Sequence, residues 1–524
     1  MEYRKLTLDE IAQLREQGCR SSDWELINVA ADFTAAKVRN VRFEGEVRIG
    51  QDVSIENVGV LRTTDGATFG QGVTVSVKNE AGDGNVILYS ALTSQTAALM
   101  TQWSEDERLF SHLRNMTELF VSQNIAQCTT IGSGVTITDC RELTNVSVGD
   151  DAELCGASRL IDCTIVTSPE ASVYIGDDVI MENCIAQAGA TIVDGARLYD
   201  SFVGEACHIG RGFTSENSLF FANSHMDNGE ACAALCGPFS VSHHKSSLLI
   251  GGEYSFYNAG SGTNFSNHAY KMGPIHYGTM QRGAKTASGA HILWPAEIGA
   301  FSMAMGKIET HPDTSMFPFS YVIGNGRKTN LKPGQNLCTV GTYRDVMKWP
   351  KRDKRPQSGR RSLIIFDWLS PYVIERIKLA IHELEHLQQT QGEDADEYTY
   401  NGYSISASAM QRGLYYYDMA LRMYEGADST TEWTDLLGLL APTETVQQIQ
   451  EDILSGDISS IEKLEEHMRD IYDSYAQWKG YAENDAEREQ ATEEWKDAIR
   501  RDAEREYDMG DVSDKQLTEF LESL

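Results

Sequence analysis

Several features that would assign a chain to a common class are missing from this sequence. No stretch approaches the run of about 18 apolar residues that marks a candidate membrane helix. The first residues, MEYRKLTLDEIAQLREQGC, are polar and contain no apolar signal core. We therefore expect a cytoplasmic protein without a membrane partner.

Cysteine pairs of the C-x-x-C type are absent too. None of the ten cysteines stands in a C-x-x-C pair, which excludes the zinc-ribbon and thioredoxin motifs. Without a secretion signal, reduced thiols are expected. We interpret these cysteines as small buried hydrophobic side chains.

Basic residues are scarce beside acidic ones, 45 against 77, and the formal net charge is −32. The acidity is uneven, because residues 441–524 hold 24 acidic and 9 basic residues, whereas residues 211–330 hold 7 and 8. This distribution argues against nucleic acid as a partner. The nearly neutral central part can still bind an anionic small-molecule substrate.

What the sequence does contain is a repeat. From about residue 38 to 210, an aliphatic–Gly step recurs at spacings of six, as in Val203-Gly204 and Ile209-Gly210, and hairpin signals are nearly absent. A triangular coil of three short strands needs about 18 residues per turn, with one aliphatic side chain per six pointing inward. Gly, Asn and Asp supply its tight corners. The pattern predicts a mainly β chain that forms a parallel β-helix of hexapeptide repeats.

This pattern resembles the trimeric hexapeptide-repeat superfamily of acyltransferases, γ-class carbonic anhydrases and nucleotidyltransferase tails. More narrowly, the whole chain resembles an uncharacterised bacterial family of long hexapeptide-repeat proteins, through the segments NHAYKMGPIHYG (267–278) and GTYRDVMKWPKRDKR (341–355). The resemblance implies a left-handed helix and a homo-oligomer, a trimer, with sites between protomers.

The chain divides into an N-terminal capping segment, the β-helix, a basic linker and an α-helical region. The capping segment contains a predicted helix with a capping box formed by Thr7 and Glu10. The corresponding boundaries are 1–37, 38–345, 346–369 and 370–524, with a helical insertion at 91–124 and an irregular, site-bearing part at 211–330. Helical patterns follow the linker at 371–390, 404–425, 431–455, 459–478 and 484–509.

One motif in the helical region imitates a zinc protease. The run from His382 to His386 satisfies H-E-x-x-H. The charged residue Glu385 and the lack of a third histidine downstream favour a solvated helix face instead.

Seven of the twelve histidines fall in residues 211–330, which makes this part the candidate site. The first hypothesis is a transferase acting on a phosphorylated small molecule, with a CoA ester or a nucleotide sugar as donor. His268 or His276 would be the general base. The substrate-binding residues would be His243, His244, Lys245, Asn264, Asn267, Lys271, Arg282 and Lys285.

Two alternatives remain open. The second hypothesis is a zinc site of the γ-carbonic-anhydrase type, held by histidines drawn from His268, His276, His291 and His311. It would carry out a lyase or hydrolase reaction. The third is a non-catalytic β-helix that binds a carbohydrate or nucleotide, or scaffolds an assembly.

Overall fold

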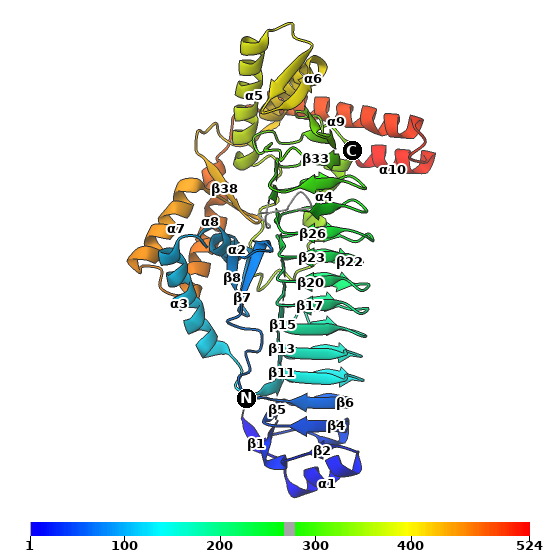
Figure 1. The fold of residues 1–524 in the computed structure, drawn as a ribbon, viewed down its shortest axis with the longest axis vertical. Helices are drawn as coiled ribbons and strands as arrows, with labels where there is room; N and C mark the ends of the chain where they lie inside the picture. The colour runs from blue at the N-terminus through cyan, green and yellow to red at the C-terminus, as the bar shows by residue number, and fades with distance from the viewer. Residues whose placement is uncertain (1, 267–277) are drawn as a thin grey trace. The chain divides into compact units, whose positions relative to one another are not determined.

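Residues 2–266 and 278–524 are described by the structure, a computed structural model (Figure 1). The chain divides into two compact units, each built from separate segments. Unit 1 contains Met1–Glu253, Lys354–Leu363 and Gln450–His467, and unit 2 contains Tyr254–Asp353, Ile364–Ile449 and Met468–Leu524. In both units most strand pairs are parallel, and the described residues also form ten α-helices. The prediction of a mainly β chain with mostly parallel strands and added helices is confirmed.

The strands of unit 1 form three parallel ladders, visible as the stacked arrows of Figure 1. Ladder A contains β3 (Ile27–Ala30), β5 (Val47–Ile49), β9 (Thr129–Ile131), β18 (Phe202–Val203), β21 (Leu219–Phe220) and β24 (Leu235–Cys236). Ladder B contains β10 (Thr136–Thr138), β12 (Glu153–Cys155), β14 (Tyr174–Ile175), β16 (Thr191–Ile192), β19 (His208–Gly210), β22 (His225–Asp227) and β25 (Val241–Ser242).

Ladder C contains β2 (Arg20–Ser21), β17 (Arg197–Tyr199), β20 (Thr214–Glu216), β23 (Glu230–Cys232) and β26 (Leu248–Ile250). Five longer strands pass from one ladder to the next: β4 (Val38–Glu44), β6 (Ser54–Arg62), β11 (Glu142–Val148), β13 (Arg159–Ile165) and β15 (Ile180–Ala186).

The core of unit 1 is built by side chains that stack from strand to strand. In ladder B, Ile175, Ile192, Ile209 and Met226 occupy successive positions and each is fully buried. Corner residues adopt positive φ, as at Asn183 and Asp200, where the Asn183 amide donates a 3.0 Å hydrogen bond to the Asp200 carboxylate. In ladder B, one apolar side chain per strand therefore stacks in the core.

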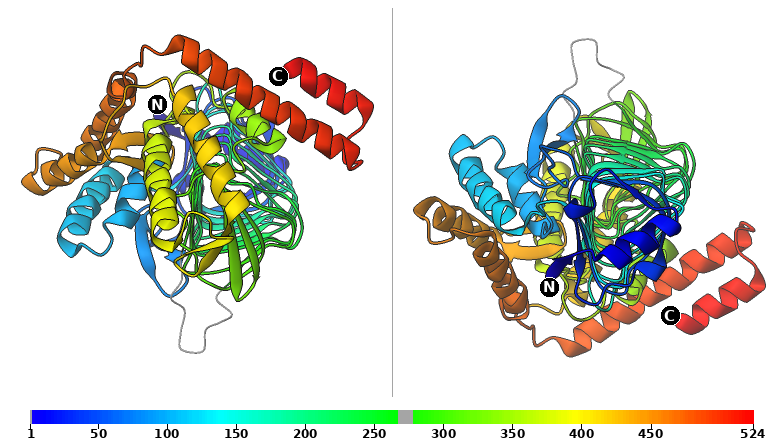
Figure 2. Two further views of the ribbon diagram at one scale, coloured as in Figure 1. Left: turned by 90° about the horizontal axis from the view of Figure 1, so that it is seen from above. Right: turned by 90° about the horizontal axis from the view of Figure 1, so that it is seen from below.

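The start of the chain lies across the end of these ladders (Figure 2). Strand β1 (Tyr3–Lys5) pairs antiparallel with β3, and helix α1 (Leu8–Glu16) follows. The predicted capping box is confirmed, because Thr7 Oγ1 accepts from Glu10 N–H and the Glu10 carboxylate accepts from Thr7 N–H. Short 3₁₀ turns, η1 (Trp24–Leu26) and η2 (Ala35–Lys37), complete this segment.

An insertion interrupts the ladders between β6 and β9. It begins with the hairpin of β7 (Thr74–Asn79) and β8 (Asp83–Ile87), and continues with helices α2 (Ser94–Gln102) and α3 (Glu107–Asn124). On α3, Leu109, Leu113 and Met116 are buried, which is the helix face expected from the sequence.

Unit 2 continues the parallel pairing in β28 (Asn264–Ser266), β29 (Thr279–Met280), β30 (Lys285–Thr286), β31 (His291–Leu293), β32 (Glu297–Ile298), β33 (Met303–Ile308) and β34 (Tyr321–Gly326). Strand β27 (Glu253–Tyr254) contains residues of both units. Antiparallel pairs follow in β35 (Lys328–Lys332), β36 (Glu397–Tyr400), β37 (Tyr403–Ser406), β38 (Trp433–Leu436) and β39 (Leu439–Pro442).

Helices fill most of the C-terminal part. They are α4 (Val340–Lys348), α5 (Pro371–Gln391), α6 (Ala407–Met423), α7 (Thr443–Ser455), α8 (Ile461–Lys479), α9 (Asp485–Asp508) and α10 (Asp514–Ser523), with the 3₁₀ turn η3 (Pro350–Arg352). Residues 433–442, expected to be helical, form the β38–β39 hairpin instead. Strand residues there are largely buried on both sides of the turn, so their apolar run imitates a helix face.

Two further expectations can be checked in this part of the chain. On α5, His382 and His386 are exposed, in keeping with a solvated helix face. None of the helices in the described ranges combines the length and apolar character that a membrane crossing requires.

Candidate metal centre

Two histidines and an aspartate come together on the outer side of ladder B. His208 lies at the start of β19, and the pairing of β19 with β22 places it beside His225, 17 residues further along the chain. Asp227 ends β22 opposite Gly210. Because side chains alternate along a strand, His225 and Asp227 point to the same outer face while Met226 points into the core.

The ligand atoms of these three side chains converge. His225 Nε2 lies 3.1 Å from Asp227 Oδ2, and His208 Nε2 lies 3.5 Å from Asp227 Oδ1. One ligand atom of each residue, an imidazole nitrogen or a carboxylate oxygen, lies within 4.8 Å of the ligand atoms of the other two residues. The imidazole rings of His208 and His225 have centroids 4.5 Å apart, so the two rings face the same small volume.

Asp227 is the unusual member of the cluster. Its side chain is only 3% exposed, and Oδ1 accepts no hydrogen bond from the described residues. A buried carboxylate oxygen without a donor costs free energy, on the order of 1–3 kcal/mol or more. Such an oxygen is a natural ligand for a cation.

Electrostatics favour the neutral imidazole of His208 in the cluster and of His243 beside it. Burial lowers the pKa of His208, and the neighbouring His225 lowers it further, while Asp227 acts in the opposite direction. The pKa of His243 is lowered by burial and then by His244 and His225. Neutral imidazole is the form that binds metal.

Gly210 keeps the space beside the cluster open. A Cβ atom at this position would lie 3.2 Å from both Asp227 Oδ1 and His208 Nε2. With Val193 Cγ2 also 3.1 Å away, a methyl group there would require these neighbours to move by a few tenths of an ångström.

Chemically, two imidazoles and a carboxylate form a set suited to zinc or a similar transition metal. Three protein ligands leave a coordination position for water. The side chains of His208 and His225 are 32% and 41% exposed, so solvent and a small substrate can reach them. The residues present therefore fit a catalytic rather than a closed structural metal site.

Some of the residues predicted from the sequence lie beside this cluster. His243 follows β25, with its ring centroid 5.9 Å from that of His225 and 4.4 Å from that of His244. His244 and Lys245 are exposed at the same corner. His243 and His244 extend the row of imidazoles that begins with His208 and His225.

Other predicted residues lie elsewhere or cannot be placed. His268 and His276, the predicted bases, and Asn267 and Lys271 lie outside the described residues. Asn264 and His291 are paired in register on β28 and β31. His311 is exposed, and its Nδ1 lies 3.2 Å from the Pro295 carbonyl. The one cluster of three potential ligands found within the described ranges contains neither His291 nor His311.

Two predicted phosphate-binding residues already have partners. Arg282 is 3% exposed, and its guanidinium forms an ion pair with Asp435 and donates to the Ile365 and Gly438 carbonyls. Lys285 is ion-paired with Asp345. Both cations therefore hold unit 2 together in this structure.

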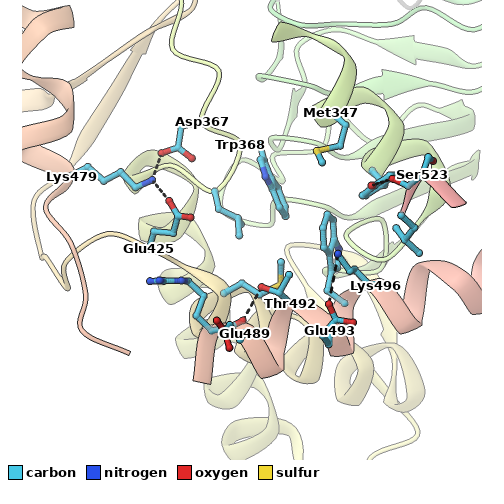
Figure 3. Close-up of a pocket in the computed structure, with 16 residues that line it drawn as sticks. Met347, Asp367, Trp368, Glu425, Lys479, Glu489, Thr492, Glu493, Lys496 and Ser523 are labelled. Atoms are coloured by element: carbon cyan, nitrogen blue, oxygen red, sulfur yellow. Dashed lines mark hydrogen bonds and ion pairs between the residues drawn. The ribbon is translucent and has the colours of Figure 1, made fainter. Parts of the chain in front are cut away.

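Unit 2 contains a second candidate site, a pocket of about 630 Å³. The indoles of Trp368 and Trp495 stack at 5.0 Å along its wall, and Figure 3 shows Trp368 directed into it. Lys479 lies 2.6 Å from Asp367 and 3.6 Å from Glu425. Its aromatic wall and paired charges suit binding of a neutral ring more than catalysis.

The sequence prediction includes none of the three ligand residues. His208 lies before the histidine-rich part at 211–330, and His225 and Asp227 lie within it but are assigned no role. A usable signal was present, because His208 and His225 are separated by 17 residues, the offset of paired strands in ladder B. Aligning polar residues by this offset would have brought the two imidazoles together.

Fold and site define a mainly β, mostly parallel chain with a histidine–aspartate cluster on one ladder. The chain belongs to the family described as "Domain of unknown function (DUF4954)", whose model matches residues 3–52 and 47–388 and so includes the cluster. A second model, "Domain of unknown function (DUF6819)", matches residues 420–484.

A relative is also known from Treponema pallidum (strain Nichols), an uncharacterized protein. It is 24% identical over an alignment of 421 residues, and the match covers 67% of this chain and 57% of the relative. The chain thus spans little more than half the length of this relative.

Proposed function

We propose that unit 1 binds one divalent transition-metal ion, of the zinc type, through His208, His225 and Asp227, and that it adds water to a small carbonyl substrate. This is a lyase or hydrolase reaction. The observation that carries the proposal is the buried Asp227 carboxylate, whose Oδ1 accepts no hydrogen bond from the described residues and faces two imidazoles. A bound ion would satisfy that oxygen.

The protein side chains have separate roles in this proposal. His208 and His225 supply neutral nitrogen ligands through Nε2, and Asp227 supplies the negative charge that offsets the cation. When bound, the ion would lower the pKa of a coordinated water to about 7. The partial exposure of both imidazoles leaves room for the carbonyl group to approach.

For the fold, we infer that the three ladders of unit 1 are a left-handed β-helix of hexapeptide repeats that assembles as a trimer. The regular parallel pairing and the inward aliphatic row support this. The hand and the trimer rest on the resemblance to γ-class carbonic anhydrases and acyltransferases. The proposed ligand set differs from the three histidines of the γ-class enzymes, because Asp227 replaces one imidazole.

Group transfer is the second candidate function. The 3.1 Å contact of His225 with Asp227 is the arrangement in which a carboxylate orients a histidine base. A transferase using His225 in place of His268 or His276 would need no metal. The donor would be a CoA ester or a nucleotide sugar.

A third candidate is binding of a carbohydrate or nucleotide without catalysis, supported by the indole-lined pocket of unit 2. Such binding would not depend on the His208 cluster. It could therefore coexist with either catalytic function.

Metal analysis by inductively coupled plasma mass spectrometry separates these candidates. We expect about one zinc, iron or cobalt per chain in the purified, untagged protein, and loss of that metal in His225→Ala and Asp227→Asn. His386→Ala, on an exposed helix face, is the matched control and should keep the metal. A chain that stays metal-free after incubation with zinc would exclude the metal site and favour the transferase.

A further inference from the structure

The corner that follows β19 carries an arginine with an unusual backbone. Arg211 has φ 51°, in the left-handed region that residues other than Gly, Asn and Asp adopt less often. The same corner of the neighbouring coils holds Asp194 at φ 54° and Asn228 at φ 57°, which lie 17 residues before and after it. Both of those residues tolerate this conformation.

Other corners of unit 1 place Ala206 (φ 53°) and Phe239 (φ 57°) in the same region, so the backbone alone assigns no role to Arg211, and its contact with the cluster has to carry the inference. An asparagine or aspartate would fit the corner better, so fold stability alone does not explain an arginine. The preceding and following coils show that the corner itself does not require a cation.

The side chain of Arg211 adjoins the proposed metal site. Its Nε lies 3.6 Å from Asp227 Oδ2, while the side chain as a whole is 64% exposed. The guanidinium is thus anchored loosely at one nitrogen, and most of it faces solvent beside His208 and His225. A surface ion pair of this kind contributes at most about 1 kcal/mol and is easily exchanged.

We propose that Arg211 is a substrate-binding residue that holds a small oxyanion, a carboxylate or a tetrahedral oxyanion, next to the metal. The inference rests on the proposed function and specifies its substrate class as anionic. A guanidinium presents paired N–H donors that match two oxygens of such a group. The anion would displace the loose contact with Asp227 and leave that carboxylate to the ion.

The test uses the full chain loaded with cobalt, whose visible absorption reports on ligands at the metal. Wild type, Arg211→Asn and Arg211→Lys are each titrated with acetate, a planar carboxylate, and with sulfate, a tetrahedral oxyanion. Arg211→Asn places the residue of the following coil at this corner, so the variant should fold at least as well as wild type.

We expect cobalt bands of equal intensity in all three proteins, because Arg211 is not a ligand. Arg211→Asn should weaken the tighter-binding anion about tenfold, and Arg211→Lys by less, because charge is kept but the paired donors are lost. The tighter of the two anions identifies the geometry of the substrate group.

Equal anion midpoints in wild type and Arg211→Asn, with cobalt bound in both, would overturn this inference alone. Absence of the cobalt bands from all three proteins would overturn the metal site and, with it, this inference.

Discussion

Two carboxylates in unit 1 are buried to a similar degree but are used differently. Glu205 is 5% exposed and accepts hydrogen bonds from the backbone N–H groups of Arg361 and Ser362, at 2.9 and 3.0 Å, with the Arg355 guanidinium 3.4 Å away. Asp227 is 2% exposed, yet its Oδ1 accepts no hydrogen bond from the described residues.

The difference separates a structural charge from a binding charge. Glu205 anchors the segment Lys354–Leu363, part of the basic run expected to be a linker, onto unit 1. All of its charge is used within the fold. Asp227 keeps one oxygen that accepts no hydrogen bond from the described residues and lies close to two imidazoles, and we propose that this oxygen binds the ion.

Removing the structural carboxylate should have the largest effect on stability. We expect Glu205→Ala to lower the free energy of unfolding of unit 1 by about 3–5 kcal/mol, because two backbone N–H groups and the Arg355 guanidinium lose the carboxylate that they contact. Urea denaturation followed by circular dichroism measures this change. Zinc affinity of the folded variant should equal that of wild type, and a large loss of zinc with normal stability would reverse the roles assigned here.

Asp227→Asn should show the opposite behaviour. We expect zinc affinity to fall more than about 100-fold, since a ligand charge is lost. Stability without metal should change by no more than about 1 kcal/mol, because the variant weakens the contacts of Oδ2 with His225 and Arg211 but also removes the negative charge from Oδ1, which lacks a donor among the described residues. Competition with a chromophoric chelator gives the affinity, and binding as tight as in wild type would show that Asp227 is no ligand.

Acid should weaken metal binding, with a sign that follows from the lowered pKa of His208. The pKa of His208 in the folded chain lies below the ordinary value of about 6.5, so on acidification the unfolded chain binds a proton at His208 before the folded chain does. The contribution of neutral His208 to the free energy of unfolding is therefore complete above about pH 6.5 and is lost as the pH falls through the folded pKa. Zinc affinity should likewise be level above about pH 6.5 and then fall by up to about tenfold per pH unit for each protonated imidazole. Affinity that rises on acidification between pH 7 and 5.5 would contradict neutral imidazole ligands.

The smallest effect is expected from added bulk beside the cluster. In Gly210→Ala the new Cβ would press on Asp227 Oδ1 and His208 Nε2, and we expect zinc affinity to drop about tenfold with little change in melting temperature. Gly341→Ala is the control, because its Cβ would approach no atom closer than 3.7 Å. Identical zinc affinity in both variants would mean that the space at Gly210 has no part in the site.

Much of the fold could be predicted because its signals are local or periodic. The Thr7–Glu10 capping box, the inward aliphatic rows and the helices of the insertion all follow from spacing. The β38–β39 hairpin could not be told from a helix, because its apolar residues are buried on both faces. The spacing of apolar residues cannot distinguish a strand from a helix where both faces of the segment are buried.

The candidate site was harder to predict for a related reason. The local density of histidines leads to the prediction of His243, His244 and Lys245, of which His243 lies beside His225. His208 and Asp227 join them only through strand register, which has to be known to the residue before side chains on successive coils can be aligned. The anchoring of Arg282 by Asp435 lies far along the chain from any local signal, so its phosphate-binding role could not be judged in advance.

The most direct test of the metal site is anomalous diffraction from a crystal of the full chain soaked with zinc and measured at the zinc absorption edge. The account predicts a peak about 2.0–2.1 Å from Nε2 of His208 and of His225, and at similar distance from an oxygen of Asp227. The peak should vanish in Asp227→Asn. Zinc bound elsewhere in the wild-type crystal, with this position empty, would contradict the account.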